Sequence, residues 1–147
     1  MPRHAVRKIV FDTNIYIAAI QGGSGSSEYG ILLESLPVTY LSSVVSAELF
    51  AGAITPSGTR LVEHFVLRSH GVGRIITPTH ESWNETGRIL AKIGTKEPEF
   101  KTKFPKLFRD ALLVMSALQV GAAIRTKDEQ DFLLIRRYKR FVLEIAN

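Results

Sequence analysis

The chain has 147 residues, 45% of them hydrophobic and 22% charged, a composition typical of one soluble globular domain. It contains no cysteine, which excludes disulfides, thiolate metal sites and a cysteine nucleophile. The uncharged, largely apolar run over residues 111–124 has 14 residues and is too short to span a bilayer.

The net charge of +5 is unevenly distributed. Residues 1–91 carry seven Lys/Arg and seven Asp/Glu, whereas residues 92–147 carry twelve Lys/Arg and seven Asp/Glu. A basic half favours a polyanionic partner such as nucleic acid. A solvated basic surface without a partner fits the charge equally well. The basic N-terminus, residues 1–8, runs into an apolar segment that Asp12 interrupts, so we expect no signal peptide and a cytoplasmic protein.

The first predicted element is a short buried strand over residues 9–11, an apolar run with β-branched residues. Asp12 follows at its carboxyl end, where open α/β sheets place their ligands. Thr13 and Asn14 are cap-type residues, and a helical run over residues 15–20 comes next. Asp12 is therefore either a site residue or simply the cap of that helix.

A second strand–helix pair follows. Residues 28–36 read as a short helix stopped by a proline, residues 38–41 as a strand, and residues 44–53 as a helix capped by a serine. In that helix Glu48 shares a face with Val44, Val45 and Ala51 by helical spacing. A carboxylate on an apolar face is costly unless it is paired or binds a cation. A snorkelling or salt-bridged glutamate is the alternative.

The middle of the chain is predicted to be mainly helical. Residues 59–69 and 81–93 are amphipathic, with a short extended piece over residues 74–78 between them, and residues 94–103 read as a surface loop. Residues 106–121 form an almost uniformly apolar helix, which predicts a central core position. Its only acid, Asp110, lies in the expected first turn, so helix capping is the alternative to a site role.

The C-terminal part repeats the pattern seen at Asp12. A short strand over residues 122–126 leads through Thr126 to Asp128, followed by a helical run over residues 133–138. Residues 140–145 alternate in polarity and read as a final edge strand.

Strand–helix alternation predicts an α/β fold, with Asp12 and Asp128 at one edge of a parallel sheet. Glu48 and Asp110 would enter this edge from helices. Four neighbouring carboxylates raise one another's pKa values unless a cation compensates them, and oxygen ligands suit Mg²⁺ or Mn²⁺. Such a cation activates water for attack on a phosphodiester.

A basic surface beside the acids would hold the polyanion that they repel. The residues preferred for this contact are those that lead directly into Asp110, namely Lys101, Lys103, Lys106 and Arg109.

Four short motifs together resemble those of PIN-domain nucleases, in particular the VapC-type toxins of prokaryotic toxin–antitoxin pairs. They are Phe-Asp-Thr-Asn at residues 11–14, Ser-Ala-Glu-Leu at 46–49 with a following glycine, Arg-Asp-Ala at 109–111, and Thr-Lys-Asp at 126–128 with a later Asp-Phe. The resemblance covers essentially the whole chain. It implies one nuclease domain over residues 1–147, an α/β/α sandwich around a mostly parallel sheet, and metal-dependent cleavage of RNA.

The resemblance also implies roles for single residues. Asp12, Glu48 and Asp110 would bind the metal, Mg²⁺ or Mn²⁺, and Asn14 and Thr126 would support the site by hydrogen bonding. For the fourth acid, Asp128 follows its strand directly and ranks above Asp131, the alternative.

The resemblance further implies a cognate antitoxin and a homodimer. The antitoxin would insert a basic side chain among the acids, because a guanidinium holds carboxylates as readily as a metal does. Its apolar segment would lie against helices 28–36 and 59–69, at Leu32, Leu33, Leu61 and Phe65.

Two other functions compete with this one. A phosphatase of the haloacid dehalogenase type also has an aspartate after its first strand, but it needs a second aspartate two positions later, where this chain has Asn14. A non-catalytic PIN-like RNA-binding or regulatory domain would keep the acids only as structure.

Overall fold

One sheet of five strands divides the molecule. The computed structural model describes residues 7–23 and 25–146, and its strands lie in the order β3-β2-β1-β4-β5, with every neighbouring pair parallel. The strands are β1 Ile9–Phe11, β2 Thr39–Ser42, β3 Ile75–Ile76, β4 Ala123–Thr126 and β5 Leu143–Ile145. The final strand lies at an edge of the sheet, as predicted.

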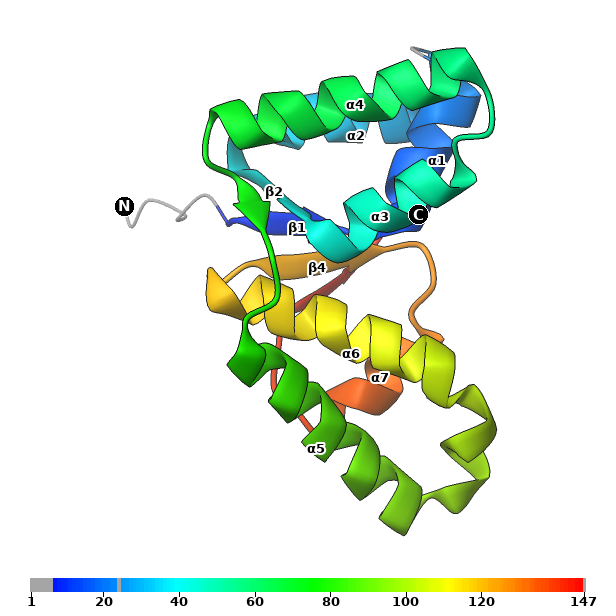
Figure 1. Cartoon of the computed structure of the whole chain (residues 1–147), viewed down its shortest axis with the longest axis vertical. Helices are drawn as coiled ribbons and strands as arrows, with labels where there is room; N and C mark the ends of the chain where they lie inside the picture. The colour runs from blue at the N-terminus through cyan, green and yellow to red at the C-terminus, as the bar shows by residue number, and fades with distance from the viewer. Residues whose placement is uncertain (1–6, 24, 147) are drawn as a thin grey trace.

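Helices cover both faces of the sheet (Figure 1). One layer contains α1 Thr13–Gly22, α2 Ser27–Ser35, α3 Ser43–Gly52 and α4 Pro56–Gly71, and the other contains α5 His80–Lys96, α6 Phe104–Gln119 and α7 Gln130–Arg136. Two 3-10 turns, η1 Leu36–Val38 and η2 Pro98–Lys103, link helices to their neighbours. The predicted α/β/α sandwich is confirmed.

The chain changes direction across the sheet between β1 and β4. The segment from β1 to β3 builds the sheet outward on one side, and β4 then returns to pair with the other side of β1. The backbone amide of Asp12 donates to the carbonyl of Arg125 at 2.9 Å, which fixes the register of the two strand ends. Ligands of open α/β sheets bind at the carboxyl ends of such a switch point.

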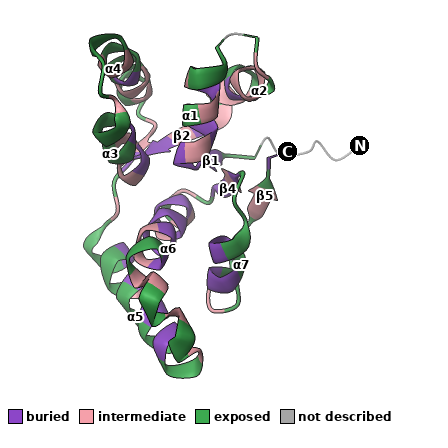
Figure 2. Cartoon of the chain, turned by 90° about the vertical axis from the view of Figure 1, so that its right-hand side faces the viewer, coloured by how far each residue is buried: buried purple, intermediate pink, exposed green. Residues whose placement is uncertain are grey.

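The core lies on both faces of the central strands (Figure 2). Val10 of β1 is fully buried, and so are Leu107, Leu113 and Val114 of α6. This burial confirms the prediction that the apolar helix is central to the core. Burying such large aliphatic side chains is the main favourable contribution to folding.

Two predictions are wrong here, the surface loop over residues 94–103 and the start of the next helix at residue 106. Residues 94–103 are not a loop, since α5 continues to Lys96 and η2 follows directly. Gly94 permits this course, because a Cβ there would meet the Phe104 ring at 3.0 Å. The helix α6 then begins at Phe104, with Pro105 in its first turn, where a missing backbone N–H costs nothing.

The N-terminal residues 1–6, on which the expectation about a signal peptide partly rests, lie outside the described residues. Across residues 7–23 and 25–146, no helix combines the length and the apolar character needed to cross a membrane.

Candidate functional site

Asp12 lies at the carboxyl end of the central strand β1, and it also caps α1. Its Oδ1 accepts a hydrogen bond from the backbone amide of Thr13 at 2.8 Å. Its Oδ2 accepts one from the Thr126 hydroxyl, on the neighbouring strand β4, at 2.8 Å. The carboxylate thus caps α1 and also faces the switch point of the sheet, so the two alternatives raised from the sequence are compatible.

Two polar side chains orient this carboxylate. The Asn14 amide donates to Asp12 Oδ2 at 3.4 Å and to the Thr126 hydroxyl at 3.2 Å, while its oxygen accepts from the Lys127 amide at 3.2 Å. Thr126 is fully buried at the end of β4. These contacts favour the supporting role that the family resemblance implies for Asn14 and Thr126.

Glu48 reaches the site from the rim of α3. Its side chain is 41% exposed, whereas Val45 and Leu49 of the same helix face the core. The expectation of a glutamate on a buried apolar face is therefore wrong, because Val44 is only half-buried and Ala51 is exposed. The Thr13 hydroxyl donates to Glu48 Oε1 at 2.8 Å, a link between α1 and α3 that the sequence did not reveal.

Asp110 is almost completely buried, with 2% of its side chain exposed. Because α6 begins at Phe104, Asp110 lies in the second turn and does not cap the helix, contrary to the alternative raised from the sequence. Burial raises the pKa of Asp110, and the nearby positive charges of Arg109 and Lys106 offset this effect only in part. A buried carboxylate at this position depends on cations.

Arg109 joins three of the predicted metal-binding acids. Its Nη2 lies 2.7 Å from Asp12 Oδ1, its Nε donates to Glu48 Oε1 at 2.7 Å, and its Nη1 donates to Asp110 Oδ1 at 2.7 Å. Nη2 also donates to the Thr13 hydroxyl at 2.7 Å. The arginine side chain is only 20% exposed, so the guanidinium faces the acids and not the solvent.

Lys106 plays a similar part toward the C-terminal acids. Its Nζ lies 3.2 Å from Asp110 Oδ2, 2.7 Å from Asp131 Oδ2 and 3.5 Å from Asp128 Oδ2. The spacing of four residues from Lys106 to Asp110 was a sequence signal for this contact. No comparable signal marks Arg109, whose partners Asp12 and Glu48 come from other elements.

The four basic residues predicted to face RNA thus divide into two kinds. Lys106 and Arg109 bind the acids, and Lys103 pairs with Asp131 at 3.1 Å. Lys101 lies exposed on η2 and forms no ion pair within the part of the chain that the structure describes.

The two candidates for the fourth acid lie in different surroundings. Asp128 has a side chain that is 54% exposed and lines the same cavity as Asp12, Glu48 and Asp110. Asp131 is 6% exposed and faces Lys103 and Lys106 at the start of α7. The exposed position leaves Asp128 free to reach a ligand, whereas Asp131 holds two lysines in place.

Asp12, Glu48, Asp110 and Asp128 line one open cavity of about 470 Å³, which we call the acid pocket. Thr13, Asn14, Lys106 and Arg109 also line it. The carboxylate and carbonyl donors match a hard divalent cation such as Mg²⁺ or Mn²⁺. As the described side chains stand, however, no three acidic or histidine side chains are grouped to hold a metal ion. The donor types suit a cation, and the Arg109 guanidinium lies among them.

The chain matches the family model of the PIN domain over residues 9–138. This range contains all four acids of the acid pocket, together with Asn14 and Thr126. No curated protein matches the chain significantly.

Several solved structures share the fold over nearly the whole chain. VapBC2 from Rickettsia felis, bound to a DNA fragment from its promoter, is 20% identical with a TM-score of 0.64, covering 95% of this chain and 98% of that one. FitAcB from Neisseria gonorrhoeae is 20% identical with a TM-score of 0.65, covering 95% and 96%. DNA-bound VapBC from Salmonella typhimurium is 18% identical with a TM-score of 0.64, covering 95% and 98%. At these identities the likeness establishes the fold.

Proposed function

Because the chain belongs to the PIN domain family, we propose that it is a metal-dependent endoribonuclease and the toxin of a toxin–antitoxin pair. On this proposal residues 1–147 form one nuclease domain that acts in the cytoplasm. The observation that carries the proposal is the convergence of Asp12, Glu48, Asp110 and Asp128 on one pocket at the switch point of a parallel sheet.

Mg²⁺ or Mn²⁺ would be held by Asp12, Glu48 and Asp110, with Asp128 as the fourth acid and Asp131 as its alternative. When bound, such a cation lowers the pKa of a water molecule and stabilises charge on phosphodiester oxygens. The protein's own side chains orient the carboxylates that would bind the metal. Thr126 and Asn14 fix the Asp12 carboxylate, and Thr13 positions Glu48.

Arg109 and Lys106 would have a second use once RNA is bound. The positive side chains of Arg109 and Lys106 keep the acids together, although the negative charges of the acids repel one another at this spacing. A guanidinium released from carboxylates is well suited to a phosphate group, because its planar fork matches both. Lys101 and Lys103, next to these residues in sequence, would extend the RNA-binding surface.

The toxin part of the proposal draws on the similar solved structures VapBC2, FitAcB and VapBC. We propose that a cognate antitoxin inserts a basic side chain into the acid pocket. The contacts of Arg109 support this, since they show that the pocket geometry accepts a guanidinium. Of the apolar residues expected to contact the antitoxin, Leu33 and Leu61 are exposed, whereas Leu32 is buried and is unable to contribute.

The nuclease proposal is tested with purified protein and a structured RNA, with Mg²⁺, with Mn²⁺ and with a chelator. The wild type should cleave only with metal, and Asp12→Asn should reduce cleavage to the chelator level while keeping its far-UV circular dichroism. Glu34→Gln, an exposed acid on α2 outside the acid pocket, should cleave like the wild type. Undiminished cleavage by Asp12→Asn at equal concentration would exclude the proposed site.

The toxin proposal is tested separately, by expression in a host cell. The wild type alone should arrest growth, Asp12→Asn should not, and co-expression of a small upstream gene encoding the antitoxin should restore growth. Harmless expression of catalytically active wild type in several hosts would contradict the toxin role and leave the nuclease proposal intact.

One observation favours a second function, a non-catalytic PIN-like RNA-binding or regulatory domain. The acids of the pocket are already paired with Arg109 and Lys106, so they are compensated without a metal. RNA binding without metal, and without cleavage in any metal, would support this alternative.

A further inference from the structure

A second pocket lies at the opposite edge of the sheet from the acid pocket. It has a volume of about 190 Å³ and is lined by residues of α1, η1, β2 and α4 and of the segment before β3. Thr39 is the first residue of β2, and Arg74 immediately precedes β3, so this is the amino-terminal edge. The two pockets share no lining residue.

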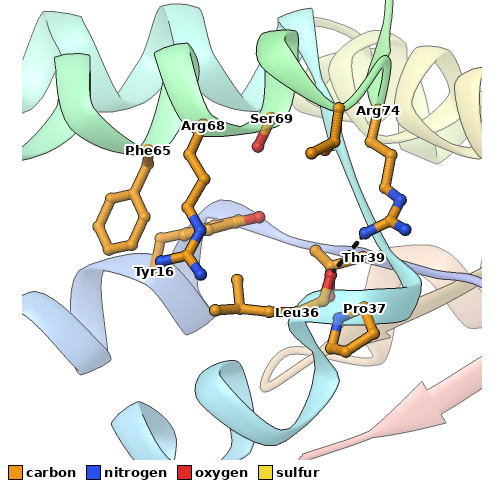
Figure 3. A pocket seen from close by; sticks show the side chains of 9 residues that line it. Tyr16, Leu36, Pro37, Thr39, Phe65, Arg68, Ser69 and Arg74 are labelled. Carbon is orange, nitrogen blue, oxygen red and sulfur yellow. Dashed lines mark hydrogen bonds between the residues drawn. The ribbon is translucent and has the colours of Figure 1, made fainter.

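The charge of this second pocket is opposite to that of the acid pocket. Two arginines, Arg68 and Arg74, line it, and no acidic side chain does (Figure 3). Arg74 Nη1 donates to the carbonyl of Leu36 at 3.1 Å. Within residues 7–23 and 25–146, neither arginine forms an ion pair, whereas Arg109 and Lys106 pair with five acids between them. Two uncompensated guanidiniums beside one hollow favour an anion there.

Tyr16 adds a hydroxyl that has no hydrogen-bond partner among the described residues. Its residue is 3% exposed, and within the described part of the chain its hydroxyl makes no hydrogen bond. Figure 3 shows that this hydroxyl points into the ring of side chains that line the pocket. Burial raises the pKa of Tyr16, so the hydroxyl keeps its proton at neutral pH and is able to donate. The hydroxyl is thus available to donate a hydrogen bond to a ligand oxygen in the pocket.

The remaining walls are mostly apolar. Phe65, Leu36, Pro37 and Val72 line the pocket beside the polar groups, and Ser69 contributes a second hydroxyl. Small-molecule sites commonly combine apolar walls with a few polar groups that fix the ligand's orientation.

From these features we infer that the pocket binds a small organic oxyanion, a phosphate or carboxylate group carried on a compact apolar body. Arg68, Arg74 and the Tyr16 hydroxyl hold the oxyanion, and Phe65 and Leu36 contact the apolar part. The inference does not depend on nuclease activity, because it uses no residue of the acid pocket.

The test is isothermal titration of metal-free protein with phenyl phosphate, benzoate, inorganic phosphate and phenol as separate probes. Phenyl phosphate or benzoate should bind more tightly than inorganic phosphate, and phenol should not bind. The tighter of the first two identifies the phosphate or the carboxylate as the preferred group. Amide chemical shifts of Tyr16, Ser69 and Arg74 should move on titration, which places the ligand.

Arg68→Ala and Tyr16→Phe should each weaken binding about tenfold or more, since a hydrogen bond to a charged group is worth about that factor. Arg68 is exposed and Tyr16→Phe keeps the ring, so both variants should fold, as thermal denaturation will show. Arg60→Ala, an exposed arginine of the same helix outside the pocket, is the matched control and should bind like the wild type. No measurable binding of any oxyanion, or equal weakening by Arg60→Ala, would overturn the inference.

Discussion

Arg109 competes with any cation for the carboxylates of the acid pocket, because it already contacts Asp12, Glu48 and Asp110. We predict that Arg109→Ala binds Mn²⁺ about tenfold more tightly than the wild type in isothermal titration, since charge-assisted contacts no longer have to be broken. Arg60→Ala, which touches none of these acids, should leave Mn²⁺ affinity unchanged. Equal or weaker Mn²⁺ affinity in Arg109→Ala would show that Arg109 does not oppose the metal.

Thr126 is the residue on β4 that fixes the Asp12 carboxylate, by a hydrogen bond of 2.8 Å. Thr126→Val keeps the shape of the side chain and removes this bond. It should lower Mn²⁺ affinity and RNA cleavage by about 10- to 100-fold, as is usual for groups that orient metal ligands. Thr95→Val, an exposed threonine of α5, provides the comparison. Wild-type affinity in Thr126→Val would mean that Asn14 alone suffices.

Single residues also show what the sequence reveals. The positions of Asp12 and Asp128 at the acid pocket were predictable because each follows a buried strand. The position of Asp110 was predictable because it is the only acid of an apolar helix. The contacts of Arg109 were not predictable, because its partners come from α1, α3 and the strand end before α1. A pattern along the chain carries no information about which distant acid a long side chain will reach.

The helix α6 supports both the core and the acid pocket, since Leu113 and Asp110 lie on the same element. Leu113→Ala should destabilise the protein by about 2–5 kcal/mol, the usual cost of a cavity at a fully buried leucine. Urea denaturation followed by circular dichroism will measure this loss. Leu67→Ala on α4, where the side chain is 71% exposed, should change stability by less than about 0.5 kcal/mol.

The turn η2 is the element from which Lys101 is able to contact RNA. If it contacts one phosphate, Lys101→Ala should reduce the slope of log affinity against log salt by about 0.7 for single-stranded RNA. Binding is measured by fluorescence anisotropy with the inactive Asp12→Asn protein. Lys92→Ala, an exposed lysine of α5, should leave the slope unchanged. An unchanged slope in Lys101→Ala would move the RNA path away from η2.

The predicted elements differ from the observed ones mostly at their ends. The existence and order of the long helices followed from apolar periodicity, which reports burial. The start of α6 at Phe104 and the helical turn of η2 did not follow from periodicity, because many of the residues around them are polar. The close approach of Gly94 to Phe104, which permits this course, is a contact between elements that a pattern along the chain does not report. The predicted start of α6 was two residues too late, which put Asp110 in the first turn instead of the second.

The molecule leaves several large apolar side chains exposed on the layer that contains α1, α3 and α4. They include Ile17, Leu33, Phe50, Ile54, Leu61 and Leu67. Apolar residues gathered on one layer favour self-association, in line with the homodimer that the family resemblance implies. Analytical ultracentrifugation at about 10–100 μM should give twice the chain mass of 16.4 kDa. Ile54→Asp should shift the mass toward the monomer, and Val142→Asp, outside that layer, should not. A monomer at the highest concentration would contradict the dimer.

The position of β1 between β2 and β4 has a consequence for folding during synthesis of the protein. Asp12 leaves the ribosome 114 residues before Thr126, to which it is hydrogen-bonded in the finished fold. At about 5–20 residues per second this interval lasts roughly 6–23 s, during which β4 does not exist to pair with β1. A nascent chain therefore lacks an assembled acid pocket, and a message cut short before codon 126 yields a fragment without one. Assembly of the acid pocket therefore waits until β4 and Asp128 have been made.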